Sequence, residues 1–229
     1  MYGFVMTDGG KLFKIRIPLP KNNDQAPESF ELLLREVNQM LKKALTILSF
    51  CLVAFTSMSH AAIIEGNPKG NVTLLEAFDY QCPRCQSMYP IIQAITKANS
   101  NLKVALMPVA ILGKLSLAKA SAAIAATMVP GKFTMLNAIL MTRPPQDQQA
   151  LTKVLKDVGL GNAHFLALMH RKFVERQLLA GLNLLKQNKT GVPLILIYPS
   201  NHPDKVLTFI GETSQQRLQA AIDHVAAVK

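Results

Sequence analysis

Residues 72–90 read Val72-Thr-Leu-Leu-Glu-Ala-Phe-Asp-Tyr-Gln-Cys82-Pro-Arg-Cys85-Gln-Ser-Met-Tyr-Pro90, and they contain the clearest structural signals in the chain. Residues 72–78 are almost entirely apolar, which predicts a central strand covered on both faces. Pro83 suits the first turn of a helix, where its missing N–H is not needed. Apolar residues then recur at helical spacing, so a helix is predicted up to about Asn99. A buried strand therefore leads directly into a helix that begins at a C-x-x-C pair.

The elements on either side of this stretch predict an α/β domain with a helical insertion. Residues 102–109 have the composition of a second strand, and residues 116–188 predict four or five helices. Strand character returns at residues 194–198 and 206–210, which we expect to form a hairpin, and residues 213–228 predict an amphipathic helix. We therefore expect a first sheet part at 62–113, a helical insertion at 114–190 and a second sheet part at 191–229.

The first sixty residues do not read as part of this domain. Residues 40–61 have the order of a signal peptide: Lys42 and Lys43, an apolar run at 44–55, and small residues at Ser59 and Ala61. We expect cleavage after Ala61, with an uncleaved anchor running on to Ile64 as the alternative. Residues 1–39 are too long for the start of a signal peptide and are interpreted as an upstream extension outside the fold.

The charge and the cysteine content of the chain argue against nucleic-acid binding and against a disulfide-stapled scaffold. The chain of 229 residues carries a formal charge of +11, but its basic residues are dispersed and it has no Trp. A scattered positive surface is typical of solvation, so we expect no nucleic-acid partner. Of the three cysteines, Cys51 lies in the segment that we expect to be removed. The mature chain keeps one cysteine pair, too few for a disulfide scaffold.

The position of this pair predicts thiol–disulfide exchange. At a helix N-terminus the free N–H groups and the helix dipole favour the thiolate form of Cys82, and Arg84 adds positive charge. Cys85 lies one turn later and is expected to be more covered. An accessible nucleophile with a resolving thiol behind it is the arrangement that exchange requires.

Two other interpretations of the pair stay open at this point. A zinc site needs two further ligands, and none of the five histidines forms a second pair at the required spacing. A structural disulfide between cysteines three residues apart closes a loop too small to stabilise the fold by much.

The same residues resemble the DsbA family of the thioredoxin superfamily. Residues 72–90 resemble its strand and active site, Gly191-Val192-Pro193 its cis-proline loop, and residues 114–190 its inserted helical domain. The resemblance covers residues 71–226 and implies a thioredoxin-like fold. It implies that Cys82 is the nucleophile, Cys85 the resolving thiol, and Pro83-Arg84 the dipeptide that tunes the redox potential. It further implies a cis Val192–Pro193 bond beside Cys82, where an extended substrate pairs with the Val192 backbone.

Glu76 matches the buried acid of the family, six residues before Cys82. A carboxyl group in a buried strand is expected to have a raised pKa, which suits a proton relay to Cys85. The alternative is an edge position with the side chain in solvent. Asp79 and Tyr80 are expected at the surface or behind the site. One departure concerns Arg84, because strongly oxidising members of the family carry His there, so their potential does not transfer to this site.

The expected function is that of a periplasmic oxidase that introduces disulfides into exported proteins. The resemblance implies no cofactor beyond the redox-active disulfide, a membrane quinone-linked partner that re-oxidises the pair, and a monomer. One alternative is a disulfide isomerase or reductase on the same fold. Such proteins often dimerise through an N-terminal module, for which about ten residues between Ala61 and the first predicted strand leave no room. The other alternative is an exported binding protein or chaperone whose cysteines are incidental.

Overall fold

The computed structural model describes residues 2–6, 12–16 and 62–227. The chain divides into two compact units, of which the first ends at Phe55 and the second begins at Thr56. In the first unit β1 (Tyr2–Met6) and β2 (Leu12–Arg16) form an antiparallel hairpin. The proposed signal peptide at 40–61 lies outside the described residues.

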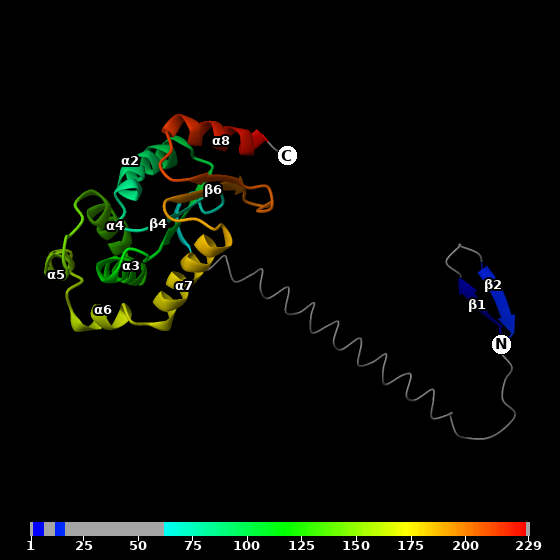
Figure 1. Cartoon of the computed structure of the whole chain (residues 1–229), viewed down its shortest axis with the longest axis horizontal. Coiled ribbons are helices and arrows are strands. Elements are labelled where there is room, and N and C mark those ends of the chain that lie inside the picture. The colour runs from blue at the N-terminus through cyan, green and yellow to red at the C-terminus, as the bar shows by residue number, and fades with distance from the viewer. Residues whose placement is uncertain (1, 7–11, 17–61, 228–229) are drawn as a thin grey trace, which may run out of the picture. The chain divides into compact units, whose positions relative to one another are not determined.

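The second unit is built on a five-stranded sheet (Figure 1). Its strands are β3 (Ile63–Gly66), β4 (Val72–Phe78), β5 (Leu102–Pro108), β6 (Leu194–Pro199) and β7 (Leu207–Ile210). They lie in the order β3-β5-β4-β6-β7, with β4 and β5 parallel and the other neighbours antiparallel. All seven residues of β4 are buried, so the apolar run is the central strand that it predicts, and the hairpin of β6 and β7 is confirmed.

Helices cover both faces of this sheet (Figure 1). The side chains of β4 alternate between them: Leu74 and Phe78 join a core with the buried residues of α2 (Pro83–Ala98) and α8 (Gln215–Ala227). Leu75 and Ala77 join a second core with α7 (Lys172–Gln187). Glu76, by the same alternation, faces the α2 side.

Five helices stand between β5 and β6, in agreement with the predicted helical insertion. They are α3 (Lys114–Ala126), α4 (Lys132–Thr142), α5 (Gln148–Asp157), α6 (Ala163–Leu168) and α7. Gly and Pro mark two of the boundaries between these helices: Gly131 adopts a left-handed φ of 72° just before α4, and Pro144-Pro145 separate α4 from α5. Asp147 and Asn162 cap α5 and α6 by accepting backbone N–H bonds from Ala150 and Phe165.

The expectation that residues 72–78 form the first strand of the sheet is wrong, because β3 precedes them. β3 runs antiparallel to β5, with Ile63 opposite Leu106 and Ile64 opposite Ala105. A four-residue edge strand with one face exposed is too short to show a period in the sequence. The alternative of an anchor that runs on to Ile64 conflicts with this strand. Within the described residues, no helix combines the length and the apolar character that crossing a membrane requires.

Candidate functional site

The cysteine pair lies at the start of α2, as predicted. Cys82 is the N-cap residue and Pro83 opens the helix. The Cys82 N–H donates to the Asp79 carbonyl at 3.0 Å, and the Gln86 N–H donates to the Cys82 carbonyl at 3.1 Å. These bonds close the turn between β4 and α2, so the Cys82 side chain lies at the free N–H end of the helix.

The two thiols differ in burial in the expected sense. Cys82 is 8% exposed and Cys85 is fully buried. Burial raises the pKa of the Cys85 thiol far above its ordinary value. A hydrogen bond with Cys82 and the charges of Cys82 and Glu76 raise the pKa further, whereas a hydrogen bond with the Asp79 backbone lowers it. A reagent from solvent therefore meets Cys82 first, and Cys85 strongly prefers to carry a proton.

The loop before β6 lies against Cys82, although it is 110 residues away in the sequence. The Val192–Pro193 bond is cis, as expected. The Cys82 thiol donates to the Val192 carbonyl, with Sγ and O 3.9 Å apart. Pro193 is buried, and its carbonyl accepts from the Gly211 N–H at 2.8 Å, which ties the loop to the end of β7. The helix start and the cis-proline loop thus form one site.

Glu76 lies beneath this site with its carboxyl group buried. Its side chain is 2% exposed, so the alternative of a solvent-facing edge position is wrong. Burial raises its pKa to about 8, and the charge of Glu65 contributes in the same direction. Its Oε1 has no hydrogen-bond partner among the described residues. A carboxyl group in this state holds a proton near neutral pH and can pass it to a neighbour.

Comparison with known proteins agrees with this geometry. No family model matches the chain, and no curated protein matches it. Among solved structures, a thioredoxin-like oxidoreductase from Silicibacter pomeroyi DSS-3 is 26% identical, with a TM-score of 0.67 over 74% of this chain and 94% of that one. The chain has a thioredoxin-like fold and belongs to the thioredoxin superfamily. With its cysteine pair, it is an oxidoreductase of that superfamily.

Two more distant structures share the fold. The thiol-disulfide exchange protein alpha-DsbA2 from Wolbachia pipientis is 19% identical, with a TM-score of 0.63 over 71% of this chain and 86% of that one. A periplasmic thioredoxin-like protein from Salmonella enterica serovar Typhimurium is 21% identical, with a TM-score of 0.60 over 73% and 91%. The helical block between β5 and β6 is therefore part of a recurrent architecture.

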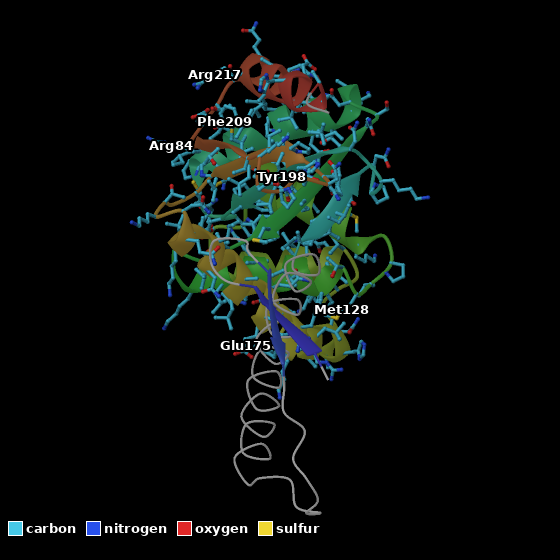
Figure 2. All side chains as sticks on the ribbon, turned by 90° about the vertical axis from the view of Figure 1, so that its right-hand side faces the viewer. Arg84, Met128, Glu175, Tyr198, Phe209 and Arg217 are labelled. Carbon is cyan, nitrogen blue, oxygen red and sulfur yellow. The ribbon has the colours of Figure 1, made fainter. Side chains whose placement is uncertain are left out.

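Pro83 and Arg84, the dipeptide between the cysteines, both face solvent. Figure 2 shows Arg84 at the edge of the molecule. A guanidinium group in water is well screened, so Arg84 acts on the site less strongly than a charge held against the sulfur.

Asp79 lies behind the site, which is one of the two places that we expected for it. It is fully buried. Its Oδ1 accepts from the Gln81 N–H at 2.8 Å, and its Oδ2 accepts from the N–H groups of Ile111 and Leu112 at 2.9 and 3.1 Å and from the Ser116 hydroxyl. Asp79 thereby joins the cysteine turn, the loop after β5 and α3. Its place directly between a buried strand and the C-x-x-C pair was the one signal of this role.

Two further buried polar residues stand behind the cysteine turn. The Tyr80 hydroxyl donates to Asn137 Oδ1 of α4 at 2.8 Å. Lys119 of α3 is fully buried, its ammonium group donates to Gln81 Oε1, and burial lowers its pKa. Both bonds bridge the turn to the helical insertion. Among residues 2–6, 12–16 and 62–227, no three His, Cys, Asp or Glu side chains gather as a set of metal ligands.

Proposed function

We propose that this chain introduces disulfides into exported proteins through the Cys82–Cys85 pair. The observation that carries the proposal is the contact of the Cys82 thiol with the Val192 carbonyl, above a buried Cys85 and Glu76. An extended substrate that pairs with the Val192 backbone would place its own cysteine beside Cys82.

The reaction follows from the difference between the two thiols. In the oxidised protein a substrate thiolate attacks Cys82 Sγ, the Cys82–Cys85 bond breaks, and Cys85 leaves with the electron pair. Cys85 takes a proton from Glu76, because its buried thiolate is strongly disfavoured. The substrate's second thiolate then attacks the mixed disulfide and Cys82 leaves as a thiolate, so that the substrate is oxidised and the pair is reduced.

The proposal includes the route and the partners of the protein. We infer export by the signal peptide at residues 40–61 and action in the periplasm on proteins with free thiols. The Cys82–Cys85 disulfide serves as the redox group without a further cofactor. A membrane quinone-linked protein restores that disulfide after each turnover.

Trapping of the mixed disulfide tests the assignment of the two cysteines. Cys85→Ser is expected to accumulate a covalent adduct with a peptide that carries a disulfide. The Cys82 thiolate attacks that disulfide, one half leaves as a thiol, and no resolving thiol remains to release the other half. Cys82→Ser, the matched control, is expected to form no adduct, because Cys85 is buried. An adduct through Cys85 in the control would reverse the two roles.

The redox state in cells decides between an oxidase and its alternatives. Acid quenching followed by thiol alkylation is expected to find the pair mostly oxidised. A mostly reduced pair would indicate an isomerase or reductase. A state that is indifferent to deletion of every redox partner would indicate a binding protein or chaperone.

A further inference from the structure

A second carboxyl group, Glu65 of β3, lies on the same face of the sheet as Glu76. Glu65 is opposite Val104 of β5, and Val104 is opposite Leu74 of β4, two residues before Glu76. Side chains opposite one another in a sheet share a face, and so do residues two apart in a strand. Glu65 and Glu76 therefore both point to the side covered by α2, separated by β5.

The two carboxyl groups differ in their access to water. Glu76 is 2% exposed in the central strand, whereas Glu65 is half-buried in the edge strand. Gln93 of α2 donates its Nε2–H to Glu65 Oε2 at 3.3 Å. Tyr89, one turn earlier on the same side of α2, is also only partly buried. The edge of the sheet at Glu65 thus borders solvent along the flank of α2.

Both carboxyl groups also keep one oxygen without a partner. Glu65 Oε1 and Glu76 Oε1 are buried and have no hydrogen bond among the described residues. Buried polar oxygens in native proteins are normally paired, so two unpaired ones on the same face call for an explanation. The charge of Glu65 acts on Glu76, which places the two groups within electrostatic reach of each other.

We propose that Glu65 is the solvent-side end of a proton path that runs from Cys85 through Glu76 to the edge of the sheet. This inference rests on the proposed exchange reaction and holds for either direction of it. When the disulfide is reduced, Cys85 leaves as a thiolate and takes the proton of Glu76. The Glu76 carboxylate then regains a proton by way of Glu65 from water. When the pair is re-oxidised, the same proton moves outward.

The surroundings of Glu76 offer few other carriers. Its titratable neighbours among the described residues are Glu65 from β3, Cys85 from α2 and Tyr80 after β4. Tyr80 is fully buried, and burial raises its pKa well above its ordinary value, so it does not release protons near neutral pH. The residues opposite Glu76 in the two neighbouring strands are aliphatic, Leu106 of β5 and Ile195 of β6. The buried residues of α8 in the core on this face of the sheet are apolar as well: Leu218, Ala221, Ile222 and Val225. Among these groups, Glu65 has the greatest access to solvent.

The test is the pH profile of disulfide reduction in Glu65→Gln. The rate at which dithiothreitol reduces the Cys82–Cys85 disulfide is measured by rapid acid quench and alkylation between about pH 6 and about pH 9. In the wild type we expect an inflection near pH 8, from Glu76. In Glu65→Gln the inflection should move to lower pH, because a negative neighbour is gone. The rate near neutral pH should also fall by about a hundredfold, the lower end of what a positioned proton-transfer group contributes.

Two control variants separate this role from a structural one. Glu65→Asp keeps a carboxyl group and should restore most of the rate and of the inflection. Glu175→Gln changes an exposed residue of α7, remote from Arg84 in Figure 2, and should follow the wild type throughout. A Glu65→Gln profile that superimposes on the wild type, or that falls equally at every pH without a shift, would overturn the proton path and leave the exchange reaction standing. Failure of the wild type to react would instead overturn the proposed function.

Discussion

Glu76 and Asp79 stand three residues apart, and both carboxyl groups are buried beside the cysteine turn. Asp79 accepts hydrogen bonds at both oxygens, from three backbone N–H groups and one hydroxyl. Glu76 has an oxygen with no partner among the described residues. A buried carboxylate is tolerated where donors compensate for lost hydration, and otherwise the group keeps its proton. The two acids therefore differ in their environment: Asp79 is held by four hydrogen-bond donors that tie the turn together, whereas burial raises the pKa of Glu76.

The raised pKa of Glu76 predicts that stability falls as pH rises. The folded carboxyl has a pKa of about 8 against an ordinary value of 4.5, so the folded state binds the proton more tightly. The stabilisation is complete below pH 4.5 and is lost as pH rises through about 8. Glu76→Gln removes this dependence. Its free energy of unfolding should exceed that of the wild type increasingly between pH 5 and pH 8, by on the order of a few kcal/mol.

Urea denaturation followed by circular dichroism at several pH values measures this difference. Glu175→Gln is the matched control, because its carboxyl group is exposed. If the free energies of unfolding of Glu76→Gln and the wild type differ by the same amount at every pH between 5 and 8, the pKa of Glu76 is not raised in the folded state.

Single residues were predictable from the sequence where their role depends on neighbours in the chain. Cys82 and Cys85 follow from their spacing at a helix start, and the burial of Glu76 follows from the apolar strand around it. Glu65 and Asp79 were not predictable in this way. Their roles depend on Gln93, 28 residues later, and on Ile111 and Ser116, 32 and 37 residues later. Contacts of this kind arise only when the sheet and helices have assembled.

At the scale of elements, the boundaries that Pro and Gly mark were predictable, whereas pairing at the edge of the sheet was not. Pro83 opens α2 and Gly131 precedes α4, because each residue has a fixed or special backbone preference. β3 carries no such mark, and only its hydrogen bonds to β5 make it a strand. Asp79 shows how a single side chain fixes the relative positions of separate elements. Its carboxylate accepts hydrogen bonds from the turn before α2, the loop after β5 and the first turn of α3.

Replacing Asp79 with Asn tests this connection between elements. The amide keeps one accepting oxygen and turns an NH₂ group toward donors of the loop or the turn. The free energy of unfolding should fall by about 2–4 kcal/mol, the cost of leaving buried donors unpaired and losing charge-assisted bonds. Urea denaturation gives the value directly.

Asp157→Asn is the control for this variant. Asp157 is an exposed residue of α5 whose carboxylate pairs with Lys153 at 2.9 Å, one turn earlier. Its removal should cost less than about 0.5 kcal/mol, as is usual for exposed ion pairs. If Asp79→Asn lowers the free energy of unfolding by an equally small amount, the Asp79 carboxylate is not needed to hold the cysteine turn, the loop after β5 and α3 together.

At the scale of the whole molecule, the sheet with its five-helix insertion was predictable because the order of elements is distinctive. Two apolar strands, a helical block, a hairpin and a final helix leave few arrangements in which every apolar face is covered. The sequence also indicated that the cis-proline loop would meet Cys82, but only through the resemblance to the DsbA family. Nothing local in Gly191-Val192-Pro193 specifies that contact, which needs β4 and β6 to lie side by side.

β3 also constrains where the chain can be cut after export. We expect the mature protein to begin at or near Ala62, one residue before the strand. Cleavage further on would remove Ile63, whose partner is Leu106, or Glu65, on which the proposed proton path depends. N-terminal sequencing and intact mass of protein from the periplasmic fraction of its own cells measure the start. Recovery of an intact Met1 in the cytoplasm would contradict both export and an oxidase role, because the cytosol keeps such thiols reduced. A start beyond Glu65 would leave export standing and would exclude Glu65 from the mature enzyme.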